Sequence, residues 1–135
     1  MTQATFSIII PVKPGGAVRA LEALRRVDYP AEDFEVLVAE GRCPSLQRNL
    51  AAGEAKGEYL YFLDDDSLVA PDFLRRAAAC YEKRYIVAVG GPSLTPEDDS
   101  PPAAGIRAGP GVSIRRWCGP EPVPALRRAS RDRRP

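Results

Sequence analysis

The stretch that decides the fold is residues 59–67, which read Tyr-Leu-Tyr-Phe-Leu-Asp-Asp-Asp-Ser. Five apolar or aromatic residues run directly into three carboxylates. A strand with one face in solvent would alternate apolar and polar residues, so the unbroken run predicts a buried strand of a parallel sheet. The aspartates then follow the carboxyl end of that strand, where open α/β sheets bind their ligands.

Asp64, Asp65 and Asp66 are adjacent like charges, and two hypotheses explain them. In the first, they bind a divalent cation or a cationic ligand, because carboxylate oxygens are the donors that Mg, Mn and Ca prefer. In the second, they form a solvated acidic turn before the next helix. A short motif alone does not separate the two, so the rest of the chain has to decide.

The composition limits the possible chemistry. The chain has 135 residues, which suits one domain with one core. It has no histidine and three widely spaced cysteines. This excludes Cys/His zinc sites, histidine bases and Ser-His-Asp triads, and it favours a reducing compartment. No signal peptide or membrane-spanning run is visible, so the sequence predicts a cytoplasmic protein without a transmembrane segment.

Short runs rich in β-branched and aromatic residues predict four strands, at residues 6–12, 35–39, 59–63 and 86–89. Apolar residues at helical spacing predict helices between them, at residues 17–27, at 45–55 and from 71 onward. Ser45 is expected to cap the second helix, and Gly57 to follow it in a left-handed conformation. The repeated βαβ order predicts an α/β fold with a mainly parallel sheet, flanking helices and right-handed crossovers.

Charged side chains follow three of these strands where each strand ends. Lys13 comes after the first strand, Glu40 after the second, and Asp64 to Asp66 after the third. The carboxyl ends of parallel strands meet at one edge of a sheet, so these groups are expected to lie together. Their convergence favours the ligand-binding hypothesis over the solvated turn.

The segment from residue 100 to 135 has a different composition. It holds 7 Pro, 8 Arg and 4 Gly in 36 residues. Its net charge is positive, whereas residues 1–99 have an excess of acidic residues, 16 against 11 basic ones. No strand pattern or amphipathic helix of useful length is present, so burial would not offset the entropy of ordering. We predict a folded unit at 1–99 and a disordered Pro/Arg-rich tail at 100–135. Nucleic-acid binding is not expected, because Trp117 alone among aromatic residues accompanies these arginines.

Five short motifs follow one another between about residues 5 and 95. They are a first strand ending in proline (residues 7–11), a Tyr-Pro pair (29–30), an Arg-Asn helix (47–49), an Ala-x-Gly-Glu-Tyr turn (55–59) and an acidic motif (62–66). In this order they resemble the family 2 glycosyltransferases, which have a GT-A fold. Each motif is weak alone, but their order is specific.

The resemblance implies that the chain binds a nucleotide-diphosphate sugar as donor, with a saccharide or lipid-linked acceptor that the sequence does not identify. Asp64 and Asp66 match the two acids of the Asp-x-Asp motif and would bind Mg or Mn. The expected nucleotide-sugar contacts are Pro11, Val12, Glu40, Arg48, Asp64 and Asp65. Glu40 stands where the family usually has an aspartate that reads the base. The alternatives are strand-end packing for Pro11 and Val12, and a surface role for Arg48.

The sequence departs from the family pattern after residue 99. The half that carries the acceptor site and the catalytic base is not recognisable there, so the catalytic residues stay unknown. We expect an incomplete fold, truncated or frameshifted after about residue 99, with a membrane-peripheral location left open for a longer form. Two other functions stay open. One is a non-catalytic remnant that binds nucleotide-sugar without transfer, and the other is a phosphatase of the haloacid-dehalogenase type with Asp64 as nucleophile.

Overall fold

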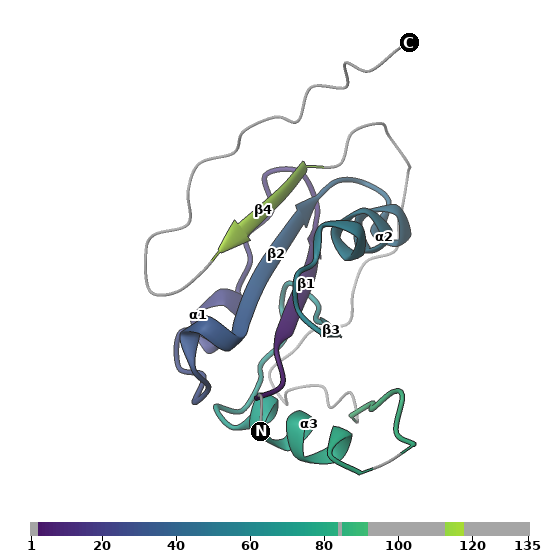
Figure 1. Cartoon of the computed structure of the whole chain (residues 1–135). Coiled ribbons are helices and arrows are strands. Elements are labelled where there is room, and N and C mark those ends of the chain that lie inside the picture. The colour runs from purple at the N-terminus through teal and green to yellow at the C-terminus, as the bar shows by residue number, and fades with distance from the viewer. Residues whose placement is uncertain (1–2, 84, 92–112, 118–135) are drawn as a thin grey trace.

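The computed structural model describes residues 3–83, 85–91 and 113–117. Its elements are, in chain order, β1 (Phe6–Val12), α1 (Ala20–Leu24), the 3-10 helix η1 (Ala31–Asp33), β2 (Phe34–Glu40), α2 (Pro44–Glu54), β3 (Tyr59–Phe62), α3 (Phe73–Tyr81) and β4 (Ser113–Trp117). The strand order is β3-β1-β2-β4 (Figure 1). The first three strands are parallel and β4 is antiparallel to β2. The predicted α/β fold with a mainly parallel sheet is confirmed.

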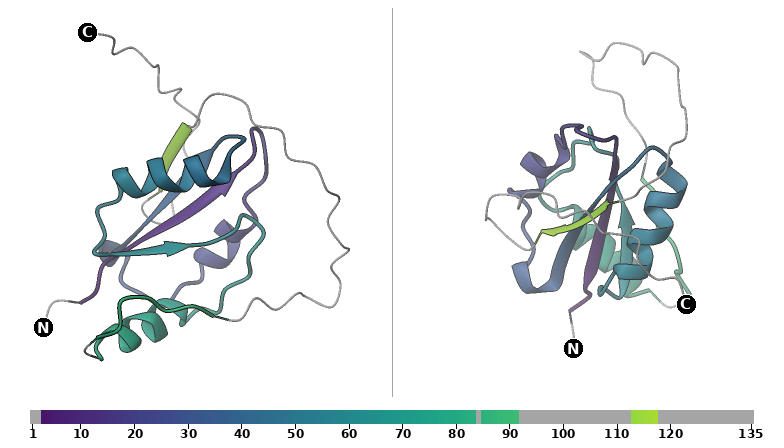
Figure 2. Two further views of the ribbon diagram at one scale, coloured as in Figure 1. Left: turned by 90° about the vertical axis from the view of Figure 1, so that its right-hand side faces the viewer. Right: turned by 90° about the horizontal axis from the view of Figure 1, so that it is seen from above.

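Alternating side chains of β1 and β2 build a core on each face of the sheet. Ile8 and Ile10 face α1 and α3, where Leu24 and Leu74 are almost completely buried. Ile9 and Leu37 face α2 and pack against its alanines. The sheet therefore lies between α2 on one side and α1 with α3 on the other. The right-hand view in Figure 2 shows α1 and α2 on opposite sides of the strands. Every residue of β1 is buried, because β1 has a strand on each side and helices on both faces.

The prediction that residues 59–63 form a fully buried strand is wrong. Within the described part of the sheet, β3 is an edge strand in which side-chain burial alternates. Tyr59 and Tyr61 pack against the larger core, whereas Leu60 is 39% and Phe62 is 51% exposed. The reason is that α2 packs on β1 and β2 and leaves this face of β3 uncovered.

The predicted fourth strand at residues 86–89 does not form. Ile86 donates one backbone hydrogen bond, to Lys83 at 3.4 Å, and Val87 is 94% exposed. Strand propensity is expressed only when a neighbouring strand and a covered face are available. Ser113–Trp117 instead supplies the fourth strand, so the prediction of no strand in 100–135 is wrong for these five residues. The rest of that segment lies outside the described residues, and the division at residue 99 stays a prediction.

Two local predictions around α2 are also wrong. Cys43, not Ser45, precedes the helix, and no side chain caps its first turn, where Pro44 stands. Gly57 does not have a positive φ; among the glycines that the structure describes, Gly15 does. Gly57 is required for another reason. A Cβ atom there would lie 2.5 Å from the backbone of Phe6, so only glycine lets this turn approach β1.

Candidate functional site at the carboxyl edge of the sheet

The predicted ligand groups lie at one edge of the sheet because of the strand register. Val12 at the end of β1 is opposite Glu40 at the end of β2. The amide of Leu63 donates to the carbonyl of Ile9 at 3.0 Å, which extends the β3 pairing to the residue before the aspartates. The structure therefore brings the ends of β1, β2 and β3 together, with Asp64 following directly.

The three aspartates form a tight turn that is anchored at both ends. Leu63 is 8% exposed and belongs to the larger core, and the amide of Ser67 donates to the carbonyl of Asp64 at 3.1 Å. The carbonyl of Asp65 accepts from the amide of Ala20 at 2.9 Å, which ties the turn to the start of α1. Asp64 and Asp66 project into solvent, whereas Asp65 is half-buried.

The electrostatics of this turn favour a cation. Burial raises the pKa of Asp65 above its usual value, and the charges of Asp66 and Asp64 raise it further. A raised pKa means that the ionised carboxylate is disfavoured where it stands. A positively charged ligand would reverse this cost, because an opposite charge within a few ångströms stabilises the ionised form.

Arg48 reaches this turn from α2. Its guanidinium lies 3.2 Å from the Asp64 carboxylate, and its side chain is 35% exposed. An ion pair this exposed adds little stability, because water screens it. The contact instead keeps a planar, phosphate-compatible cation beside the aspartates. Arg48 is therefore brought to the candidate site, although its predicted contact with a nucleotide stays a prediction.

Pro11 and Val12 are both buried at the end of β1. Val12 is 3% exposed and is part of the larger core, so packing accounts for much of its side chain. Glu40 is half-buried at the same edge. The structure places these three residues at one edge of the sheet, and their contact with a nucleotide base stays a prediction.

The prediction from sequence missed Gln47. Its side chain is 1% exposed, and its Nε2 donates to the carbonyls of Val12 at 2.9 Å and Ala39 at 2.6 Å. A signal was present, since Gln47 and Ala51 are four residues apart and share the inward face of the predicted helix. A polar residue on a face that packs against a sheet calls for a buried hydrogen-bond partner.

The sequence model of the family described as Glycosyl transferase family 2 matches residues 31–120, two thirds of the chain. The chain belongs to glycosyl transferase family 2. This family groups glycosyltransferases that use nucleotide sugars, and the match contains Glu40, Arg48 and all three aspartates. No curated protein and no solved structure matches the chain significantly. Within the described ranges, no helix has the length and apolar character to cross a membrane.

Divalent metals are common in glycosyl transferase family 2. In residues 3–83, 85–91 and 113–117, no group of three or more His, Cys, Asp or Glu side chains is arranged to hold a metal ion. Asp64 and Asp66 nevertheless have suitable chemistry, since Mg²⁺ is usually held by one or two carboxylates together with substrate phosphates and water. The residues fit a metal that arrives with a diphosphate better than a cage formed by the protein alone.

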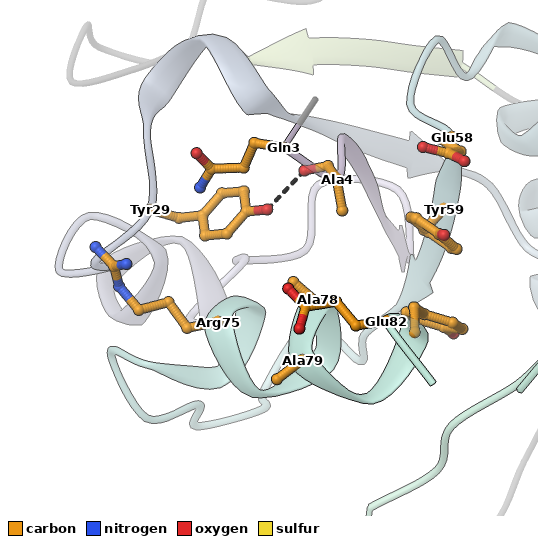
Figure 3. A pocket seen from close by; sticks show the side chains of 10 residues that line it. Gln3, Ala4, Tyr29, Glu58, Tyr59, Arg75, Ala78, Ala79 and Glu82 are labelled. Atoms are coloured by element: carbon orange, nitrogen blue, oxygen red, sulfur yellow. Dashed lines mark hydrogen bonds between the residues drawn. The ribbon is translucent and has the colours of Figure 1, made fainter. Parts of the chain in front are cut away.

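A pocket of about 700 Å³ lies at the opposite end of the sheet (Figure 3). Tyr29, Tyr59 and Arg75 are among its lining residues, and none of the predicted site residues is. Tyr29 donates its hydroxyl to the carbonyl of Ala4 at 2.6 Å. Parallel sheets bind ligands at the carboxyl ends of their strands, and this pocket is at the amino ends. We therefore place the candidate site at the aspartates and not in this pocket.

Proposed function

We propose that this family 2 chain binds a nucleotide-diphosphate sugar through Asp64, Asp66 and Mg or Mn, and transfers the sugar to a saccharide or lipid-linked acceptor. One observation carries the proposal most directly. The Arg48 guanidinium lies 3.2 Å from Asp64, so a phosphate-compatible cation and the acidic turn stand side by side at the carboxyl edge. Family membership supplies the reaction class.

Each residue has a distinct role in this proposal. Asp64 and Asp66 offer solvent-exposed carboxylates that bind the metal. The bound metal would neutralise the charge that develops on the departing diphosphate. Arg48 exchanges its contact with Asp64 for the diphosphate, since arginine matches phosphate geometry. The nucleoside side of the site is lined by four residues, Pro11, Val12, Glu40 and Asp65. We assign no catalytic base among the described residues.

Cys43 and Cys80 are free thiols, which fits a cytoplasmic location where thiols stay reduced.

Binding without transfer is the second candidate function. The open face of β3 favours it, because Phe62 beside the aspartates is 51% exposed and no described element covers it. Family membership favours both candidates over a phosphatase.

The test is nucleotide-dependent stabilisation of the 135-residue chain. UDP, GDP and dTDP are each titrated with and without MgCl₂ or MnCl₂ while the melting temperature is recorded. A nucleotide at about 100 times its dissociation constant should add about 2.7 kcal/mol, and only when metal is present. Asp64→Asn and Asp66→Asn should each remove this shift. Glu32→Gln is the matched control, since it removes one exposed acid in η1, away from the site.

A folded chain that shows no metal-dependent shift with any of the three nucleotides would contradict the proposal. If the chain does bind a nucleotide, an assay of radiolabelled sugar transfer separates the two candidate functions. Incorporation of sugar into an acceptor, or metal-dependent hydrolysis of the donor, supports the transferase. Metal-dependent nucleotide binding with neither reaction supports the binding remnant.

A further inference from the structure

Gln47 links three elements at the candidate site. It stands in the first turn of α2, and its buried amide lies against the ends of β1 and β2. Both hydrogens of Nε2 are used, one on the carbonyl of Val12 at 2.9 Å and one on the carbonyl of Ala39 at 2.6 Å. A single side chain thus bonds to both of these paired strands at the edge where Val12 is opposite Glu40.

The other atom of this amide is left unsatisfied. Gln47 Oε1 is buried and has no hydrogen-bond partner among the residues that the structure describes. The orientation of the amide is fixed, because only the NH₂ group can donate to two carbonyl oxygens. A buried acceptor without a donor is unfavourable, and an apolar side chain of similar size would avoid the cost. Departures of this kind from the rules of packing are expected where a residue serves function as well as stability.

The hydrogen bonds of Gln47 act on the residues that would surround a nucleotide base. The carbonyl of Val12 also accepts from the amide of Gly41 at 2.9 Å, so Gln47 shares an acceptor with the first residue after Glu40. The next residue of α2, Arg48, reaches the aspartate turn. If Gln47 shifts, the separation of Val12 from Glu40 changes, whereas the aspartate turn keeps its own anchors, through the Leu63 amide on β1 and the Asp65 carbonyl at the start of α1.

We propose that Gln47 is a positioning residue that fixes the separation of the β1 and β2 ends and thereby the selectivity of the site for the nucleotide base. This inference rests on the proposed function, because it concerns the same donor site. It assigns base selectivity to a residue that does not touch the nucleotide. Metal and diphosphate binding depends on the aspartate turn, which Leu63 and Asp65 anchor, and on the Arg48 guanidinium, which Asp64 holds in place. It should therefore be much less sensitive to Gln47 than base selectivity is.

The experiment compares Gln47→Met with Leu50→Met in the full chain. Gln47→Met keeps the approximate length and removes both hydrogen bonds together with the orphaned acceptor. Leu50→Met is the control, on the same helix and 46% exposed. Dissociation constants are measured by calorimetry for UDP, GDP and ADP, and for inorganic pyrophosphate, all with Mg²⁺. Hydrogen exchange at the Gly41 amide is recorded without ligand.

Base selectivity is measured as the dissociation constant of the weakest-binding nucleotide divided by that of the tightest. We expect Gln47→Met to reduce this ratio by about tenfold, as for other changes in pocket fit. Pyrophosphate affinity should stay within about twofold, which is the scatter expected when contacts are unchanged. The Gly41 amide should exchange faster in Gln47→Met and not in Leu50→Met, because its acceptor carbonyl is less well held. If the methionine variant does not fold, Gln47→Asn keeps the amide but is too short to span both carbonyls, and the same results are expected.

An unchanged nucleotide ratio, an equal loss of affinity for all four ligands, or a wild-type chain without base preference would each overturn the inference. Failure of the proposed function looks different. In that case the wild-type chain binds none of the nucleotides, and base selectivity fails with it. The Gly41 exchange rates then still decide whether Gln47 holds the strand ends.

Discussion

Replacing Ser7 with alanine should strongly destabilise the chain, although Ser7 is small and lies far from the aspartates. Ser7 is completely buried at the start of β1. Its Oγ donates to Glu35 Oε1 at 2.7 Å and accepts from the amide of Gly57 at 2.8 Å. The same Glu35 oxygen accepts from the amide of Lys56 at 2.7 Å. One hydroxyl therefore joins β1, β2 and the turn that leads into β3.

The size of the effect follows from the groups that Ser7→Ala leaves behind. The change removes one donor from the carboxylate of Glu35, a residue that is 8% exposed, and it leaves the Gly57 amide without its acceptor. The lost hydrogen bond to the Glu35 carboxylate and the Gly57 amide left without its acceptor each cost about 1–3 kcal/mol, so we expect a loss of roughly 2–4 kcal/mol. At about 3–6 °C per kcal/mol for a chain of this size, the melting temperature should fall by roughly 10–20 °C.

Urea unfolding followed by circular dichroism measures this loss. Ser45→Ala is the matched control, because Ser45 is exposed in the first turn of α2 and makes no capping hydrogen bond there. It should change stability by less than about 0.5 kcal/mol. A Ser7→Ala variant within that same range would refute the reasoning, since it would mean that water satisfies both groups as well as the hydroxyl does.

Three further predictions concern other positions. Gly57→Ala should destabilise by several kcal/mol because its Cβ would meet the Phe6 backbone, whereas Gly53→Ala in α2, with open space around it, should stabilise by up to about 1 kcal/mol; equal melting temperatures would contradict this. Arg75 lowers the pKa of Asp28 below its ordinary 3.8, first through a hydrogen bond and then through charge. Because the pKa of Asp28 is lowered, its ionised form stabilises the fold above pH 3.8, and this stabilisation is lost as the pH falls through the folded-state pKa. The difference in unfolding free energy between wild type and Arg75→Ala should therefore be present at pH 7 and vanish in acid. Phe62→Thr should reduce self-association in sedimentation experiments, because Phe62 is 51% exposed on the edge strand; an unchanged sedimentation profile would assign any association to another surface.

Local patterns predicted most of the elements that place the candidate site. The apolar runs of β1 and β2 located both strands, because β-branched residues in an uninterrupted run favour a buried parallel strand. The helix predicted at residues 45–55 agrees with α2 to within a residue, and it carries Arg48 to its contact with Asp64. These features depend on neighbours in the sequence, which the chain itself displays.

Pairing and burial could not be predicted in the same way. The run at residues 59–63 has the composition of a central strand, yet β3 lies at the edge of the described sheet with Phe62 half in solvent. Residues 86–89 have a stronger strand composition than Ser113–Trp117, yet only the latter pair with β2. A strand forms where a partner offers hydrogen bonds, and the choice of partner is a property of the assembled fold.

The sequence alone determined the order of the first three strands and the helices that follow them, the absence of histidine chemistry, and the acidic turn at the end of a strand. It did so because periodicity and composition act over a few residues. Only the tertiary structure decided that Gln47 holds the ends of two strands, that Ser7 joins Glu35 to a distant turn, and that Gly57 is required by the approach of β1. The bond between Ser7 and Gly57 joins residues 50 positions apart, and packing in three dimensions selects such contacts.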